Sequence, residues 1–176
     1  MNGLDIITIA SHTSSIEELH RANMERLTQL IIFCFGVVFL LLVLLIVITK
    51  HQQKKFKARM DILTAGKQEL TAAEFLETAR MRGGQDYTGV YILHNVTQDK
   101  YYIGQAKSVL QRVTAHLTGH GNGDVYADYK YGNVFRVKTI TLAQSGYDSL
   151  NALERDLIAN YDAYTKGYNR TRGNRN

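Results

Sequence analysis

The feature that most constrains this chain is an apolar run over residues 30–48, in which nineteen consecutive residues carry no charge. As a helix the run would be about 28 Å long, which matches the hydrocarbon core of a bilayer. The alternative is a buried helix of a soluble domain, but a domain of this small size cannot surround a helix that is apolar on every face. The run therefore predicts a transmembrane helix over 30–49.

The segments on the two sides of the run differ in charge. Residues 1–29 carry four acidic and two basic residues. Beyond the run the basic residues outnumber the acidic ones, eight to five in residues 50–86 and eleven to seven in residues 87–176. Directly after the run come five basic residues with no acid among them, Lys50, Lys54, Lys55, Lys57 and Arg59. By the positive-inside rule, they place the C-terminal part in the cytoplasm and the N-terminus on the outer side of the cell inner membrane. A cleavable signal peptide is not expected, because an acidic leader precedes the run and basic residues follow it. The basic surplus suits nucleic acid or anionic lipid head groups.

The chain is expected to contain one globular part behind a tether. Its single cysteine, Cys34, lies inside the apolar run, so one chain can form neither a disulfide nor a cysteine-based zinc site. Thr71 followed by Glu74 is a capping box that indicates a helix in the basic segment. The expected domains are a leader that is helical in part (1–29), the transmembrane helix (30–49), a basic helical connector (50–86) and a globular domain (87–176).

The globular part combines short β-rich segments with amphipathic helices. Two alternating segments separated by a turn predict a β-hairpin. Ser108 is placed to cap the helix that follows the hairpin. The expected elements are strands at 88–95, 100–104 and 134–142 and helices at 108–117 and 149–161.

The predicted hairpin brings two tyrosines together. With the turn centred between Val96 and Thr97, Tyr91 stands opposite Tyr102, and directly opposed residues point to the same face of a sheet. Two phenols would then share one site. Tyrosine is also a common strand residue, so a structural role for the pair is the alternative. The other pairs of this register, which form an apolar opposite face, are Val90 with Ile103 and Ile92 with Tyr101.

Three further side chains suit phosphodiester chemistry. Arg112 and His116 are four residues apart and so lie on one helical face. An arginine can bind phosphate oxygens in bidentate fashion and oppose the charge of the transition state, although an ordinary solvated face is the alternative. Glu154 falls within the apolar stripe of its helix, where a carboxylate needs a cation. Either a divalent metal or a salt bridge to Arg112 is implied.

These residues together resemble a known family. Gly89-Val90-Tyr91, ten intervening residues and Tyr102-Ile103-Gly104 resemble the GIY-YIG nuclease superfamily, with valine in place of the first isoleucine. The resemblance covers residues 87–172 and implies an α+β fold, a small three-stranded antiparallel sheet flanked by helices. The later residues that match the family in order are Arg112, His116, Glu154 and Asn169.

The resemblance implies hydrolysis of DNA phosphodiesters with one divalent ion, Mg²⁺ or Mn²⁺, held by Glu154. It implies that Tyr102 helps to activate the attacking water and that Tyr91 supports it. His116 occupies a position that only some branches of the family use. The expected catalytic residues are Tyr91, Tyr102, Arg112, His116, Glu154 and Asn169.

The resemblance also implies the substrate contacts. Arg112 would bind the scissile phosphate, and Asn169 would orient substrate or active-site groups. Gln105 stands where some relatives have lysine, and Lys107 is close enough in sequence to supply that cation. Both Gln105 and Lys107 are expected to contact substrate.

The expected function is a membrane-anchored, metal-dependent endonuclease that degrades phage or other foreign DNA at the membrane. The alternatives are a non-catalytic membrane tether for nucleic acid and a toxin or effector nuclease. RNA is an alternative substrate to DNA. The lipid bilayer is an expected partner, and the transmembrane helix is a candidate surface for a homo-oligomer.

Overall fold

The computed structural model describes residues 3–174, with side chains described from Glu18 onward. The chain divides into two compact units, Met1–Lys54 and Lys55–Asn176. Helix α1 (Gly3–Ala65) supplies the first unit and continues into the second. The second unit therefore begins well before residue 87, where the sequence led us to expect the globular domain.

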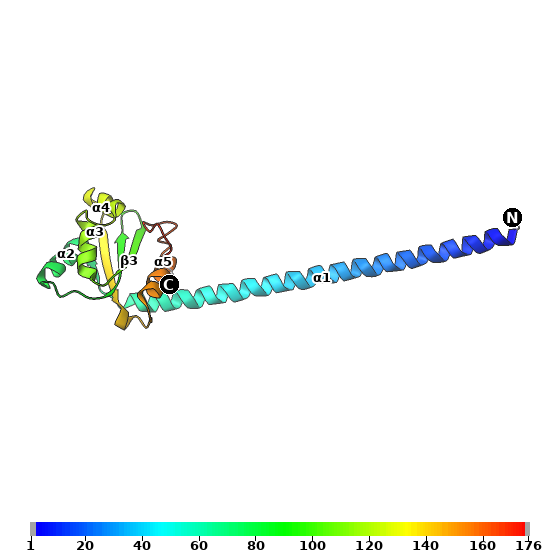
Figure 1. Ribbon diagram of the computed structural model, residues 1–176, viewed down its shortest axis with the longest axis horizontal. Helices are drawn as coiled ribbons and strands as arrows, with labels where there is room; N and C mark the ends of the chain where they lie inside the picture. Colours follow the sequence, from blue (N-terminus) through cyan, green and yellow to red (C-terminus); the bar gives the residue numbers. More distant parts are fainter. Residues whose placement is uncertain (1–2, 175–176) are drawn as a thin grey trace. The chain divides into compact units, whose positions relative to one another are not determined.

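The first unit is a single apolar helix, drawn from blue to cyan in Figure 1. Its most apolar stretch has a mean hydropathy of 3.6, and none of that stretch is buried inside the protein. Phe35, for example, is 72% exposed. Among the described residues, this is one helix long and apolar enough to cross a membrane. Its exposure argues against a core helix of a soluble domain.

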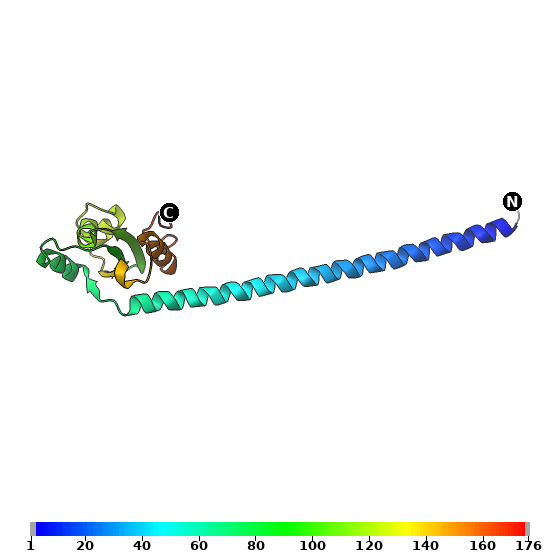
Figure 2. The same ribbon diagram turned by 60° about the horizontal axis from the view of Figure 1, so that its bottom comes forward.

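The second unit is an α+β domain, as expected, built on one antiparallel sheet with strand order β1-β4-β2-β3 (Figures 1 and 2). The strands are β1 (Glu69–Thr71), β2 (Gly89–Asn95), β3 (Lys100–Ala106) and β4 (Phe135–Thr141). The helices are α2 (Ala72–Met81), α3 (Val109–Leu117), α4 (Gly123–Lys130) and α5 (Leu150–Asn160), with a 3₁₀ turn η1 (Leu142–Gln144).

The sheet has four strands instead of the expected three. The additional strand, β1, lies in the segment that was expected to be largely helical and pairs Leu70 with Val137 of β4. A strand of three residues is too short to produce an alternating pattern, so only its pairing reveals it. The helix that follows it was expected, and Thr71 with Glu74 forms the reciprocal capping box at its start.

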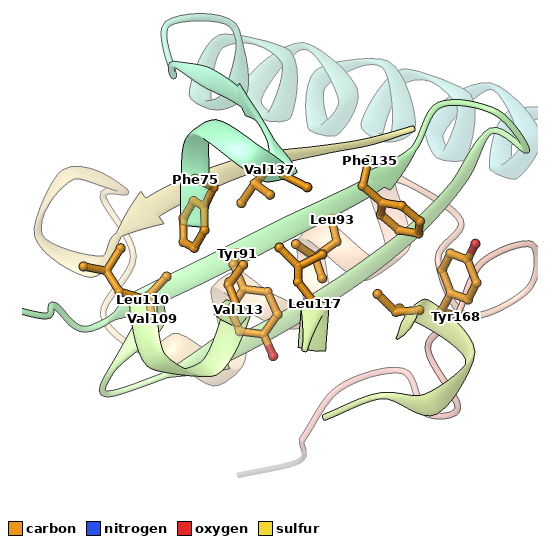
Figure 3. Close-up of a cluster of buried hydrophobic side chains, with 12 residues drawn as sticks. Phe75, Tyr91, Leu93, Val109, Leu110, Val113, Leu117, Phe135, Val137 and Tyr168 are labelled. Atoms are coloured by element: carbon orange, nitrogen blue, oxygen red, sulfur yellow. The ribbon is translucent and has the colours of Figure 1, made fainter. Parts of the chain in front are cut away.

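Both faces of the sheet are covered, and central strand β2 is buried on both of them. Tyr91 and Leu93 point into the cluster formed with α2, α3 and α4, which Figure 3 shows. Val90 and Ile92 point to the other face, against α5 and the last turns of α1. A strand between two covered faces is apolar at almost every position, as the sequence Val-Tyr-Ile-Leu is here.

The register of the β2–β3 hairpin differs from our expectation by two residues. Tyr91 pairs with Gly104, and Tyr102 pairs with Leu93. The turn is therefore centred one residue later, because the Asn95 side chain accepts a hydrogen bond from the Gln98 amide at 3.2 Å. A shift of two residues preserves the faces, so Tyr91 and Tyr102 still lie on the same side of the sheet.

Helix α3, which carries Arg112 and His116, is capped from a distant part of the chain. Ser108 was expected to cap it but makes no side-chain capping hydrogen bond. Instead, the Asp86 carboxylate accepts from the backbone amides of Leu110 at 2.8 Å and Gln111 at 3.0 Å. Although burial raises the pKa of Asp86, these amide hydrogen bonds outweigh it and hold the pKa below its ordinary value.

This cap predicts different effects for two substitutions. Asp86→Ala should lower the free energy of unfolding by about 1–2 kcal/mol, because it leaves the first amides of α3 without an acceptor. Ser108→Ala is the matched control and should have almost no effect. Thermal unfolding of the full chain in detergent micelles, followed by circular dichroism, measures both. Equal losses in the two variants would contradict the assignment of the cap.

Candidate active site

The candidate residues meet at β3, which is the edge strand of the sheet. Tyr102 extends from β3 on the side of α3, and Glu154 approaches from α5 on the opposite side. The edge leaves no further strand between them, so side chains from both faces line one small cleft of about 230 Å³. The cleft is lined by Tyr102, Ile103, Asn122, Glu154, Ile158, Tyr168, Asn169 and the tail residues Arg170, Thr171, Gly173 and Asn174.

The glycine of Tyr102-Ile103-Gly104 makes room for the other tyrosine. The Tyr91 ring lies across Gly104, and a Cβ at that position would overlap the ring and its hydroxyl oxygen. The ring is 1% exposed and packs in the cluster of α3 (Figure 3). Gly104 therefore lets the Tyr91 hydroxyl reach past β3 toward α3.

His116 is held in one tautomer by the loop that follows α3. The backbone amide of Asn122 donates to His116 Nδ1 at 2.7 Å, so Nδ1 carries no proton. The proton of the neutral ring is therefore on Nε2, which donates to the Tyr91 oxygen at 2.9 Å. Gly121 permits this approach, because a Cβ there would overlap the His116 ring. The loop was not assigned this role from the sequence.

The charge state of His116 follows from its burial. The side chain is 0% exposed. Burial first, and the charge of Arg112 second, lower the pKa of His116 from 6.5 to about 4. The imidazole is therefore neutral at neutral pH and serves as a hydrogen-bond donor.

Tyr91 is held in its protonated form. Burial raises the pKa of Tyr91 well above its ordinary value, and neighbouring Tyr102 adds to the effect, whereas Arg112 opposes it without outweighing it. Because the Tyr91 oxygen accepts from His116, its own proton is available to the Tyr102 oxygen. The Tyr102 ring is 4.9 Å from the His116 ring and 6.1 Å from the Tyr91 ring, centroid to centroid.

Glu154 is buried, with 8% exposure. Its contacts distinguish the two partners expected for this carboxylate, a divalent metal and Arg112. Its Oε2 accepts a hydrogen bond from Gln105 Nε2 at 2.9 Å, and the same nitrogen donates to Asn151 Oδ1 at 2.6 Å. Within the described part of the chain, the carboxylate has no salt bridge to Arg112 or to any other cation. The salt-bridge alternative is therefore wrong. Gln105 holds Glu154 from β3, a contact that the sequence did not suggest.

The environment of Glu154 fits a divalent ion whose other ligands are water and substrate oxygens. Over residues 3–174, no group of three or more His, Cys, Asp or Glu side chains could enclose a metal. Mg²⁺ commonly uses one or two carboxylates and keeps several waters or phosphate oxygens. One Glu154 oxygen is held by Gln105, and the other has no hydrogen-bond partner among the described residues. A single oriented carboxylate in a cleft suits this kind of binding.

Asn169 forms two hydrogen bonds with the backbone of β3. Its Oδ1 accepts from the Ile103 amide at 2.9 Å, and its Nδ2 donates to the Ile103 carbonyl at 2.7 Å. The amide side chain thus continues the hydrogen-bond pattern of the sheet at its open edge. Ile103 lies between Tyr102 and Gly104, so Asn169 fixes the position of both.

The two cations that were expected to contact substrate, Arg112 and Lys107, lie in different places. Arg112 is exposed and close to the Tyr91 hydroxyl. Lys107 is exposed beyond the end of β3 and does not line the cleft. Arg170 lines the cleft and pairs with Asp124 at 3.0 Å. The tail and Asn122 were not identified as site residues, because no spacing in the sequence connects them to Tyr102.

Comparison with known proteins identifies the domain. Residues 87–169 match the model of a family described as the GIY-YIG catalytic domain. Comparison with curated proteins and with solved structures gives no match. Domains of this family are nucleases that act on nucleic acid and generally use divalent metal ions. Through residues 87–169, the chain belongs to the GIY-YIG nuclease superfamily.

Proposed function

We propose that this protein is a membrane-anchored, metal-dependent endonuclease that hydrolyses phosphodiester bonds of DNA. The observation that carries the proposal is the cleft at the edge of β3, where Tyr102 and Glu154, whose carboxylate has no salt bridge among the described residues, line the same small space. A general base and a cation ligand are the two groups that hydrolysis of a phosphodiester needs from the protein. The family supplies the reaction class.

Tyr102 accepts the proton of the attacking water in this proposal, as the phenolate that forms when its own proton leaves to solvent through the open cleft. Of the two tyrosines of the hairpin, Tyr102 lines the cleft, whereas Tyr91 is buried and keeps its own proton. His116 donates to Tyr91, whose own proton is then available to the Tyr102 oxygen, so the two inner residues would orient Tyr102 without contacting substrate. Tyr91 and His116 are positioning residues.

Arg112 and Glu154 neutralise the phosphate in this proposal. The exposed Arg112 guanidinium would bind the non-bridging oxygens of the scissile phosphate. Glu154 would hold Mg²⁺ or Mn²⁺, which supplies Lewis-acid stabilisation of the developing negative charge. Gln105 orients Glu154, and Asn169 orients the strand that carries Tyr102.

The apolar helix supports a location at the cell inner membrane. An unburied apolar stretch followed by basic residues favours a single pass with the nuclease domain in the cytoplasm. There the domain meets DNA as it crosses the membrane, which suits degradation of phage or other foreign DNA. Confinement to the membrane also limits access of the nuclease to the host chromosome.

Two substitutions test the chemistry. Tyr102→Phe and Glu154→Gln preserve shape but remove the proton acceptor and the charged ligand. Each should slow cleavage of plasmid DNA by the full chain in Mg²⁺ about 100-fold or more. Glu154→Gln should also weaken Mg²⁺ binding in titration calorimetry. Tyr131→Phe and Glu77→Gln are matched controls at exposed positions outside the cleft.

Two results would count against the proposal. Equal cutting by the site variants and the controls would exclude this cleft as the active site. Binding of DNA without cutting by the wild-type chain would favour a tether for nucleic acid.

The buried His116 predicts a pH-dependent stability. Between pH 6.5 and about 4 the unfolded chain binds a proton at this residue and the folded chain does not, so stability falls as the pH falls. The loss approaches about 3 kcal/mol below that window and is absent above pH 6.5. Denaturant unfolding of wild type and His116→Gln at several pH values measures it. An equally steep loss in the variant would mean that other groups cause it.

The single cysteine offers a test of topology. A Cys34→Ser chain has no thiol, so one cysteine can be placed at Asn2 or at Asn176. In intact spheroplasts, a membrane-impermeant maleimide should label the chain with cysteine at position 2 and not the chain with cysteine at position 176. Labelling of both only after lysis would place both ends inside, and the reverse pattern would invert the orientation.

A further inference from the structure

A second cavity lies beside the cleft, at the C-terminal end of α5. It has a volume of about 340 Å³, and much of its wall is apolar, formed by Ile158, Ala159 and Tyr164. The Tyr164 side chain is 42% exposed, so part of its ring faces solvent. The cavity lies one turn of α5, about 5.4 Å, beyond Glu154.

The tail joins this cavity to the cleft. Ile158 lines both spaces, and Arg172 lines the cavity while its neighbour Gly173 lines the cleft. The tail crosses α5 closely here, because a Cβ on Gly173 would lie 3.2 Å from the Arg155 Cα. Figures 1 and 2 both show the red end of the chain beside the orange α5. A ligand that occupies the cleft can therefore continue directly into the cavity.

The rim of the cavity carries uncompensated positive charge. Arg155 and Arg172 are exposed and form no salt bridge with any described residue. The Arg172 guanidinium lies over the Tyr164 ring, 5.3 Å from its centroid. The one carboxylate in the wall, Asp162, is paired with Lys166 at 3.2 Å. Arginines beside an accessible aromatic ring are typical of surfaces that bind single-stranded nucleic acid.

The opposite flank of the cleft is less favourable for phosphates. The space there is lined by two carboxylates, Asp124 and Asp128, besides Lys100 and Arg170, and Arg170 is already paired with Asp124. Asp128 accepts a hydrogen bond from the Tyr168 hydroxyl at 2.6 Å. A strand whose phosphate lies in the cleft therefore leaves more favourably on the side of Arg155 and Arg172.

We propose that the cavity is a subsite for one unpaired nucleobase of the strand being cut. The base takes the place of the Arg172 guanidinium over the Tyr164 ring, between the apolar side chains of α5 and the tail, while Arg155 and the displaced Arg172 contact the phosphates on either side of it. This inference rests on the proposed nuclease function. A paired base has both faces covered and must be extruded at a cost, so the subsite selects DNA that is single-stranded next to the scissile bond.

Binding separates this inference from the nuclease reaction. The full chain in detergent micelles is titrated into fluorescein-labelled oligothymidylate, or into a duplex of equal length, in EDTA so that no cutting occurs. Wild type should bind the single strand more tightly. Tyr164→Ala should weaken single-strand binding about fivefold or more and leave duplex binding unchanged. Tyr164→Phe should retain wild-type affinity, because stacking needs the ring and not the hydroxyl.

Controls separate stacking from loss of fold. Tyr131→Ala removes an aromatic side chain that is 84% exposed outside both spaces and should bind as wild type does. Thermal unfolding of Tyr164→Ala checks that the domain stays folded at the temperature of the titration. Arg172→Ala should lower the dependence of log affinity on log salt by about 0.7 for the single strand, the loss of one phosphate contact.

The outcomes distinguish the two proposals. Equal affinity of wild type for single strand and duplex, or an equal change in both with Tyr164→Ala, would overturn the subsite. Tyr164-dependent single-strand binding without any cutting in Mg²⁺ would support the subsite and refute the nuclease. Cutting that prefers duplex in wild type and in Tyr164→Ala would support the nuclease and refute the subsite.

Discussion

The hydrogen bond between His116 Nε2 and the Tyr91 hydroxyl is the interaction on which the rest of the site depends. It connects α3 to the central strand inside the core, where an unpaired polar atom would be costly. Its direction is fixed by the Asn122 amide, which leaves His116 only one nitrogen that can donate. Because Tyr91 then accepts, its own proton is directed to Tyr102. A buried network thus lies directly behind Tyr102, the hairpin tyrosine that lines the cleft.

The open edge of β3 explains how such a small domain combines groups from two faces of its sheet. A central strand would separate Tyr102 from Glu154, whereas an edge strand lets both side chains line one cleft. The same edge would leave the β3 backbone unpaired, and the Asn169 amide compensates by bonding both the amide and the carbonyl of Ile103. Protection of an edge strand and positioning of a site residue are therefore one interaction here.

The sequence predicted the residues of the site better than their connections. Strand alternation placed Tyr91 and Tyr102 on one face of the sheet. That prediction is confirmed although the predicted register was wrong, because a shift of two residues leaves every side chain on the same face. The assignment of Ser108 as a helix cap was wrong because local spacing cannot reveal a carboxylate from another segment. Glu154 was anomalous in its helix, but only the structure shows that Gln105, and not an arginine, is its partner.

The sequence by itself determined that an apolar helix precedes an α+β domain of the GIY-YIG type, because hydrophobic periodicity and ordered motifs are local properties of the chain. The tertiary structure decided everything that depends on contacts between distant segments. It set the tautomer of His116, the role of Asn169 and the place of the tail beside α5. These contacts are formed by one or two atoms each, and no periodic pattern in the sequence records them.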